Sequence, residues 1–150
     1  MAHTFTNLLV HVIFSTKGRL PFIDSELKPQ LHAYIGGIIR EGNGKAYVIN
    51  GMADHVHILA SLPPTIALSD AMRTIKTNSS RRVHERWHTK SNFGWQTGYG
   101  AFSVSRSSVP EVTRYIIAQE EHHSKMTFQQ EFLAFLEKHG IKYDERYIWE

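Results

Sequence analysis

The stretch KAYVINGMADHVHILASL, residues 45–62, carries the strongest indication of the fold. Its β-branched and apolar composition predicts two strands, over 45–52 and 54–62, joined by a tight turn. Successive side chains of a strand point to opposite faces, so His55 and His57 project together and the small apolar residues between them project to the other side. The apolar side suits a face covered by helices, so we expect the histidine face to be open for a ligand or a partner chain.

The segments on either side of this hairpin extend the pattern to an α+β domain. Apolar runs and helical spacing predict strands over 5–15 and 99–105 and helices over 25–40, 67–88, 109–125 and 129–139. A capping-box pattern over 108–111 marks the start of the third helix. The order β-α-β-β-α-β-α-α begins as a ferredoxin-like, split βαβ sandwich, an antiparallel sheet with helices on one face, and adds a C-terminal helix that carries Tyr115.

Length and composition limit the possible classes of protein. The 150 residues, 41% of them hydrophobic, suffice for one domain spanning 1–150. The lack of cysteine excludes disulfides, thiolate metal sites and cysteine nucleophiles. No apolar run approaches the ~20 residues of a membrane span, and the N-terminus lacks the pattern of a signal peptide. We therefore expect a cytoplasmic protein without membrane contact.

The histidines and a second pair of residues predict metal-dependent phosphodiester chemistry. Tyr115 and Gln119 lie four residues apart in a helical pattern and therefore share a helix face. Two imidazoles and the amide oxygen of Gln119 can hold a divalent cation, with positions left for phosphate oxygens and water. Oxygen-rich surroundings favour Mg²⁺ or Mn²⁺, while Zn²⁺ competes by affinity. Beside such a cation, the phenol of Tyr115 is a possible nucleophile for phosphorus.

Each of these features also has a purely structural interpretation. A His-x-His pair can be two hydrogen-bonded core histidines, and Tyr115 can belong to the apolar stripe of an amphipathic helix. His122 and His123 follow within two turns, and we interpret them as surface or supporting groups. Asp54 is interpreted as a turn residue that can also orient an imidazole.

Basic residues are concentrated in two segments. The formal net charge of +3 and the pI of about 9.2 are compatible with a polyanionic partner. We interpret the basic residues of the first loop and of the helix over 67–88 as candidate DNA contacts: Lys17, Arg19, Arg73, Lys76, Arg81 and Arg82. The alternative for the helical residues is an ordinary solvated face.

In their sequence context these residues resemble a known family. His55-Val56-His57 resembles the HUH motif (histidine, hydrophobic residue, histidine), and Tyr115 with Gln119 resembles the tyrosine helix of the single-tyrosine HUH transposases of small insertion sequences. The similarity runs over 10–17, 51–59, 98–105 and 115–123, and so over most of the chain. The chain is thus similar to TnpA-like enzymes and to the related REP-associated tyrosine transposases.

The resemblance implies more than spacing can show. It implies a ferredoxin-like fold and a homodimer whose two sheets join, in which Tyr115 of one chain can act at the histidines of the other. His55, His57 and Gln119 would bind the metal, and Tyr115 would be the nucleophile. The implied substrate is single-stranded DNA with hairpin ends. Cleavage would leave a 5′-phosphotyrosine and a free 3′-hydroxyl that transfers the strand, without a nucleotide cofactor, in a nucleoid-associated protein.

Two other functions remain open from the sequence. One is a non-catalytic nucleic-acid-binding module, but such sheets stack bases on aromatic residues of their central strands. Here 8–14 offer only Phe14, and 54–62 offer none. The other is a metal-dependent hydrolase of small molecules, which would need a general base beside the metal; the candidates are His123 and Asp54.

Overall fold

The centre of the molecule is a four-stranded antiparallel sheet. The computed structural model describes residues 3–150. The strands lie in the order β2-β3-β1-β4, which is the order of the predicted split βαβ, ferredoxin-like sheet. The strands are β1 (Leu8–Ser15), β2 (Lys45–Met52), β3 (His55–Leu62) and β4 (Gly100–Ser103).

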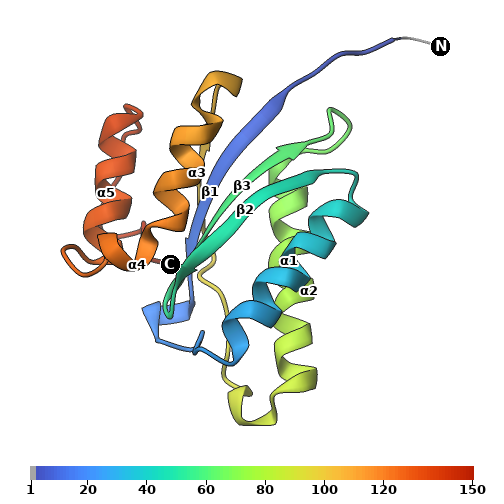
Figure 1. Ribbon diagram of the computed structural model, residues 1–150. Helices are drawn as coiled ribbons and strands as arrows, with labels where there is room; N and C mark the ends of the chain where they lie inside the picture. Colours follow the sequence, from blue (N-terminus) through green and yellow to red (C-terminus); the bar gives the residue numbers. More distant parts are fainter. Residues whose placement is uncertain (1–2) are drawn as a thin grey trace.

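Helices cover both faces of this sheet (Figure 1). Two long helices lie on one face and three shorter ones on the other. They are α1 (Leu27–Glu41), α2 (Leu68–Arg86), α3 (Val109–Ile117), α4 (Gln119–His122) and α5 (Phe128–Lys138). None of the helices within residues 3–150 has the length and apolar character needed to cross a bilayer.

The two faces bury different layers, as strand alternation predicts. Val12 and Val56 belong to the large core that the sheet shares with α1 and α2. Ile13, next to Val12, belongs to a smaller cluster under α5. Leu59, three residues after Val56, belongs to another small cluster under α3. The histidine face is therefore opposite α1 and α2, as expected. The prediction that it is open is wrong, because α3, α4 and α5 of the same chain cover it.

The third predicted helix is divided into two. The segment expected to be helical over 109–125 breaks at Ala118, whose φ of −85° and ψ of 18° separate α3 from α4. The amide of Asn50 on β2 donates to the carbonyls of Ile116 and Ile117, at 2.9 and 3.1 Å, where those carbonyls lose their helical partners. A side chain of the sheet therefore stabilises the break between α3 and α4.

The predicted capping box over 108–111 does not form. The hydroxyl of Ser108 pairs with that of Ser105 at 2.9 Å instead of capping α3. A reciprocal capping box does occur at the start of α5, between Thr127 and Gln130. It fixes the start of the helix that carries Glu131.

Candidate active site

The sheet and the short helices bring the predicted site residues together. The Nε2 atom of His55 lies 2.9 Å from the Oε1 atom of Gln119, and both side chains are fully buried. The ring centroids of His57 and Tyr115 are 5.9 Å apart. Side chains more than fifty residues apart in the sequence thus meet at one point, within one chain.

Glu131 on α5 joins this group and is the residue that sequence reasoning missed. Its carboxylate is 1% exposed and accepts a hydrogen bond from His57 at 2.8 Å. It also accepts from the amide of Gln119 at 3.0 Å and from the hydroxyl of Tyr115. Glu131 therefore connects three of the four predicted site residues.

His123 is the second addition to the site. Its Nε2 atom lies 3.1 Å from Gln119 Oε1 and 3.1 Å from Glu131 Oε1. The interpretation of His123 as a surface or supporting group is therefore revised, because its side chain is 7% exposed and faces the centre of the cluster. His122 instead packs against the ring of Tyr115, with the centroids 4.4 Å apart.

The arrangement of hydrogen-bond donors shows that the cluster fits a cation. The Nδ1 atom of His55 faces a carboxylate oxygen of Asp54 at 2.6 Å, and that of His123 faces the carbonyl of Met126 at 2.9 Å. A neutral imidazole has one N–H, and with that proton on Nδ1 each ring would turn the lone pair of Nε2 inward. Nε2 of His55 faces Gln119 Oε1, and Nε2 of His123 faces oxygens of Gln119 and Glu131. Imidazole nitrogens and acceptor oxygens that point to one place in this way form the ligand set of a metal site.

The ligand atoms are also close enough to share one ion. One atom each from His55, His57, His123 and Glu131 can be chosen so that all four lie within 4.8 Å of one another. This buried group of three imidazoles and one carboxylate could therefore bind a divalent metal.

Asp54 and His11 support the two histidines of the strand from outside the cluster. Asp54 holds Nδ1 of His55, as the sequence suggested it could. His11 on β1 is 3% exposed, and its Nε2 atom lies 2.8 Å from Nδ1 of His57. Such partners fix the orientation and tautomer of a metal-binding histidine. The sequence offered a signal for His11, because it interrupts an otherwise apolar strand.

Burial and hydrogen bonding perturb the ionisation of the cluster. Burial lowers the pKa of His57 to about 4 against the opposing effect of Glu131, so the ring is neutral at pH 7 and its contact with Glu131 is a hydrogen bond rather than an ion pair. Burial alone would raise the pKa of Glu131, but the hydrogen bonds from His57, Tyr115 and Gln119 hold it well below its ordinary value. Burial, and then the charge of Glu131, raise the pKa of Tyr115 well above its ordinary value. Without a cation, the site holds a neutral phenol against an ionised carboxylate.

Close packing of α5 on the sheet brings Glu131 into reach. A Cβ atom at Gly100 on β4 would lie 2.6 Å from the ring of Phe132, so a larger residue there would force that ring of α5 to shift. A Cβ atom at Gly51 would lie 2.2 Å from the carbonyl oxygen of His55. Gly51 is thus required by the close approach of β2 to the backbone that carries His55.

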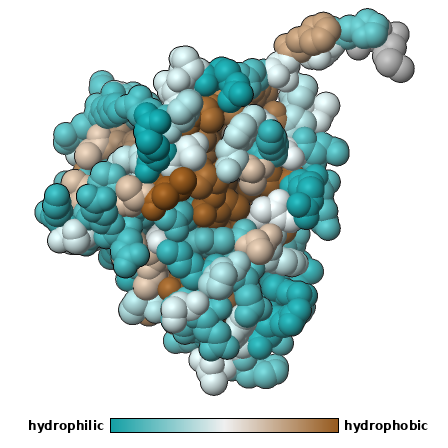
Figure 2. All heavy atoms as spheres, in the orientation of Figure 1, coloured by the Kyte–Doolittle hydropathy of each residue, from teal (hydrophilic) through white to brown (hydrophobic). Residues whose placement is uncertain are grey.

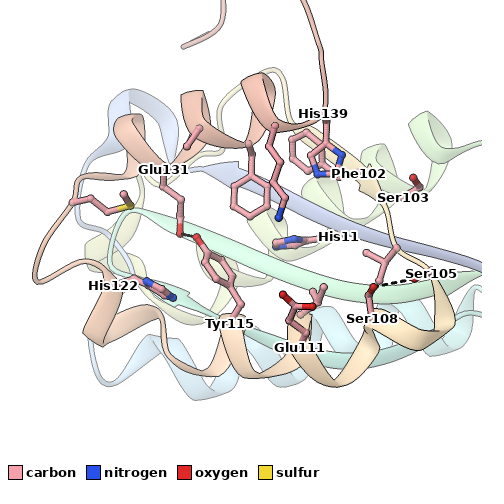
Figure 3. A pocket seen from close by; sticks show the side chains of 16 residues that line it. His11, Phe102, Ser103, Ser105, Ser108, Glu111, Tyr115, His122, Glu131 and His139 are labelled. Atoms are coloured by element: carbon pink, nitrogen blue, oxygen red, sulfur yellow. Dashed lines mark hydrogen bonds between the residues drawn. The ribbon is translucent and has the colours of Figure 1, made fainter.

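A cavity of about 580 Å³ opens beside the cluster, between α3 and α5 (Figure 3). Tyr115, Glu131 and His11 line it, whereas His55, His57 and His123 lie behind them. The nucleophile candidate is therefore reached from this cavity.

The candidate DNA contacts lie in two separate parts of the molecule. Lys17 and Arg19 follow Ser15, which pairs with His55, so they lie at the same end of the sheet as the cluster. The four residues of α2 belong to the helix layer on the opposite face (Figure 1). The ammonium of Lys76 is held by the carbonyls of the 96–98 loop, with distances of 2.9 and 3.1 Å to the first two.

The remaining three arginines of that set have surface partners. Arg73 is an exposed ion-pair partner of Asp70, at 2.9 Å. Arg81 donates to the side chain of Asn78 at 3.1 Å, and the guanidinium of Arg82 lies 5.2 Å from the ring centroid of Tyr34. These contacts are compatible with either a solvated face or a nucleic-acid contact.

Comparison with known proteins identifies relatives of the chain. Residues 4–119 match the family described as "Transposase IS200 like". The transposase for insertion sequence element IS200 from Salmonella typhimurium is 25% identical over 126 residues, covering 81% of this chain and 82% of that protein. The ISDra2 transposase TnpA of Deinococcus radiodurans is 26% identical over 116 residues, covering 74% of this chain and 83% of that protein. The family match ends at Gln119, so it does not include His123 or Glu131.

Two solved structures share the fold. A candidate transposase of Deinococcus radiodurans R1 superposes with a TM-score of 0.64 at 23% identity, covering 79% of this chain and 95% of the other. A REP-associated tyrosine transposase, solved bound to a REP hairpin, superposes with a TM-score of 0.62 at 14% identity, covering 84% of this chain and 74% of the other. At these identities the likeness concerns the fold alone.

Proposed function

The chain belongs to the family of IS200-like transposases and is a DNA transposase, and on that premise we propose that Tyr115 is the residue that cleaves the DNA. The observation that carries the proposal is the meeting of Tyr115 with the buried His55–His57 pair through Glu131 in one chain. A structural tyrosine does not require a neighbouring cluster of metal-binding groups. A nucleophile for a phosphodiester is helped by such a cluster, because a bound cation can activate it and polarise the phosphate.

The proposed step is a transesterification. The phenol oxygen of Tyr115 bonds to phosphorus, and the bond from phosphorus to the 3′-oxygen breaks. The electron pair stays on the 3′-oxygen, which leaves as a hydroxyl after gaining the proton that the phenol loses. The product is a 5′-phosphotyrosine, which conserves the phosphodiester bond energy, so that a 3′-hydroxyl can later attack it and join the strands without a nucleotide cofactor.

The cluster would hold the divalent cation that assists this step. We assign His55, His57, His123 and Glu131 as its ligands, with Gln119 as a further oxygen donor. When bound, the cation would neutralise Glu131, lower the pKa of Tyr115 and polarise the phosphate. Three imidazoles suit transition-metal ions better than Mg²⁺. We therefore expect Mn²⁺ to bind more tightly than Mg²⁺, whereas the sequence left Mg²⁺ and Mn²⁺ as alternatives.

The substrate proposal rests partly on a relative. A REP-associated transposase of the same fold was solved bound to a REP hairpin, and we propose single-stranded DNA with hairpin ends for this chain. We also propose a homodimer, for which β2 offers an edge that pairs only with β3 within residues 3–150. Figure 2 shows an apolar patch in the middle of this face, over the region where β2 and α3 lie in Figure 1. Ile117, the last residue of α3, is 62% exposed.

A covalent-adduct assay tests the proposal. The protein is incubated with Mn²⁺ and a pool of single-stranded hairpins with randomised flanks, and the products are separated on a denaturing gel. We expect wild type to form a protein–DNA adduct, a chelator to abolish it, and Tyr115→Phe to form none while it still binds the hairpins. Tyr147→Phe is the matched control, because Tyr147 is 61% exposed and is not one of the residues that line the cavity. An adduct that persists with phenylalanine at 115 would refute the assignment.

A further inference from the structure

The cavity beside Tyr115 has the size and position of a nucleoside site. Its volume of about 580 Å³ lies within the range of about 300–1,000 Å³ typical of small-molecule pockets. Tyr115 and Glu131 form one end of it, and Ser105 and Ser108 line it as well (Figure 3). A DNA strand whose phosphate reaches Tyr115 would therefore place a neighbouring nucleotide in this cavity.

Aromatic side chains form part of its wall. The rings of Phe102 and Phe135 are stacked with centroids 5.3 Å apart, and the ring of His139 stacks on Phe102 at 4.6 Å. All three line the cavity. Flat aromatic walls suit nucleobases, which every single-stranded nucleic-acid site must stack or solvate.

Two polar groups give the cavity a hydrogen-bonding character. Glu111, in the first turn of α3, lines it and is exposed on the protein surface. His11 is 3% exposed and lines it too. Its Nε2 atom pairs with Nδ1 of His57 at 2.8 Å. The cavity thus offers a carboxylate and the edge of a buried imidazole.

The carboxylate decides which part of a nucleotide enters. A phosphate would be repelled by Glu111, whereas the N–H groups of a base would be accepted by it. Guanine presents two adjacent N–H donors, N1–H and the N2 amino group, which match the two oxygens of a carboxylate. Thymine presents its single N–H between two carbonyl oxygens, which a carboxylate repels.

We propose that this cavity binds the base of a nucleotide next to the scissile phosphate and that Glu111 makes it prefer guanine. The proposal rests on the proposed function, since it names a determinant of the DNA sequence that Tyr115 cleaves. The base would stack against the wall formed by Phe102 and Phe135. Glu111 would be a specificity residue and would not take part in the chemical step.

Sequencing of the attached DNA tests this proposal. Wild type is incubated with the randomised hairpin pool, and the DNA covalently bound to protein is recovered and sequenced. We expect one position next to the cleavage site to be enriched in guanine by about tenfold. With Glu111→Gln the enrichment should fall to about twofold or less. Glu120→Gln, an exposed acid on α4 that does not line the cavity, should keep the wild-type preference.

A second substrate separates recognition by Glu111 from a general loss of binding. Inosine replaces guanine at the enriched position and lacks only the N2 amino group. It should reduce adduct formation by wild type several-fold and leave that of Glu111→Gln nearly unchanged. Adduct without base enrichment, or enrichment that survives in Glu111→Gln, would overturn the pocket proposal while the proposed function stands. The absence of any adduct would instead refute the proposed function.

Discussion

The hydroxyl of Tyr115 and the imidazole of His57 both donate a hydrogen bond to one carboxylate, that of Glu131. The three residues come from α3, β3 and α5 of a single chain. This relationship favours a site completed within one protomer over one in which Tyr115 acts at the histidines of a partner. It also makes α5, outside the matched family region, part of the candidate active site.

Complementation distinguishes the two arrangements of the tyrosine. His57→Ala and Tyr115→Phe would be co-expressed with different tags, and species carrying both tags isolated. Because each protomer would then lack one member of its own site, we expect no covalent adduct with hairpin DNA. Dimers of each variant with wild type, prepared in the same way, serve as controls and should keep about half of the wild-type activity. Adduct formation by the doubly tagged mutant dimer would establish action in trans.

Glu131→Gln should weaken metal binding without unfolding the protein. Glutamine keeps an oxygen that can accept from His57 or Tyr115, but it removes the negative charge that balances the cation. Loss of a ligand should lower the Mn²⁺ affinity at least tenfold, since even the loss of a supporting partner costs about 10–100-fold. Isothermal titration with Mn²⁺ measures the effect. Glu120→Gln should bind as wild type does, and equal affinities for all three proteins would remove Glu131 from the ligand set.

Asn50→Ala should release the junction between α3 and α4. The substitution removes the two hydrogen bonds to the carbonyls of Ile116 and Ile117, which costs about 1–2 kcal/mol in free energy of unfolding. Tyr115 and Gln119 flank that junction, so the rate of adduct formation should fall by more than the stability loss explains. Urea unfolding and single-turnover cleavage are the two measurements. Asn78→Ala, on the surface of α2, is the control. If Asn50→Ala cleaved DNA at the same rate as Asn78→Ala, Asn50 would have no positioning role.

Acid should destabilise the fold partly through His32 on α1. Burial, then the charge of Lys28, lower the pKa of His32 to about 4, and its Nε2 atom is buried without a partner within residues 3–150. Between pH 6.5 and 4 the unfolded chain binds a proton at this residue that the folded chain does not. Stability is therefore fully present above pH 6.5 and falls as the pH drops towards 4, by about 3 kcal/mol.

His32→Gln provides the comparison for this effect. The variant should lose less stability than wild type over the same pH interval, although the buried His11 and His57 act in the same direction in both proteins. Urea unfolding at half-unit intervals from pH 7 to 4.5 measures the difference. Parallel stability curves for the two proteins would show that His32 does not contribute.

Much of the fold could be predicted because the hydrophobic periods are clear. The strand over 45–52 has the predicted bounds, and β3 begins one residue later than predicted. The alternation around His55 and His57 assigned their face correctly. The covering of that face could not be derived, because it depends on how α3 and α5 fold back after β4. Their short connections carry no periodicity that reveals the direction.

The site was predicted in part for a related reason. His55, His57 and Gln119 meet as expected. The alternation of the strand places the two histidines on one face, and the helical spacing places Gln119 on the face of Tyr115. Glu131 could have been suspected from its helix alone, since it lies on the same stripe as the apolar Phe128 and Phe135, where an acid has no reason to be buried unless it is paired. Its meeting with Tyr115 could not be predicted, because it depends on tertiary packing across the break at Ala118.

Mass spectrometry of the DNA-linked peptide tests the central claim most directly. Wild type is allowed to react with hairpin DNA and Mn²⁺, then digested with nuclease and trypsin, and the peptide that keeps a nucleotide is sequenced. We expect the nucleotide to be attached through its 5′-phosphate to Tyr115. A nucleotide on another residue, or DNA cut without any attached peptide, would contradict the convergence of this phenol and the paired imidazoles on one phosphate.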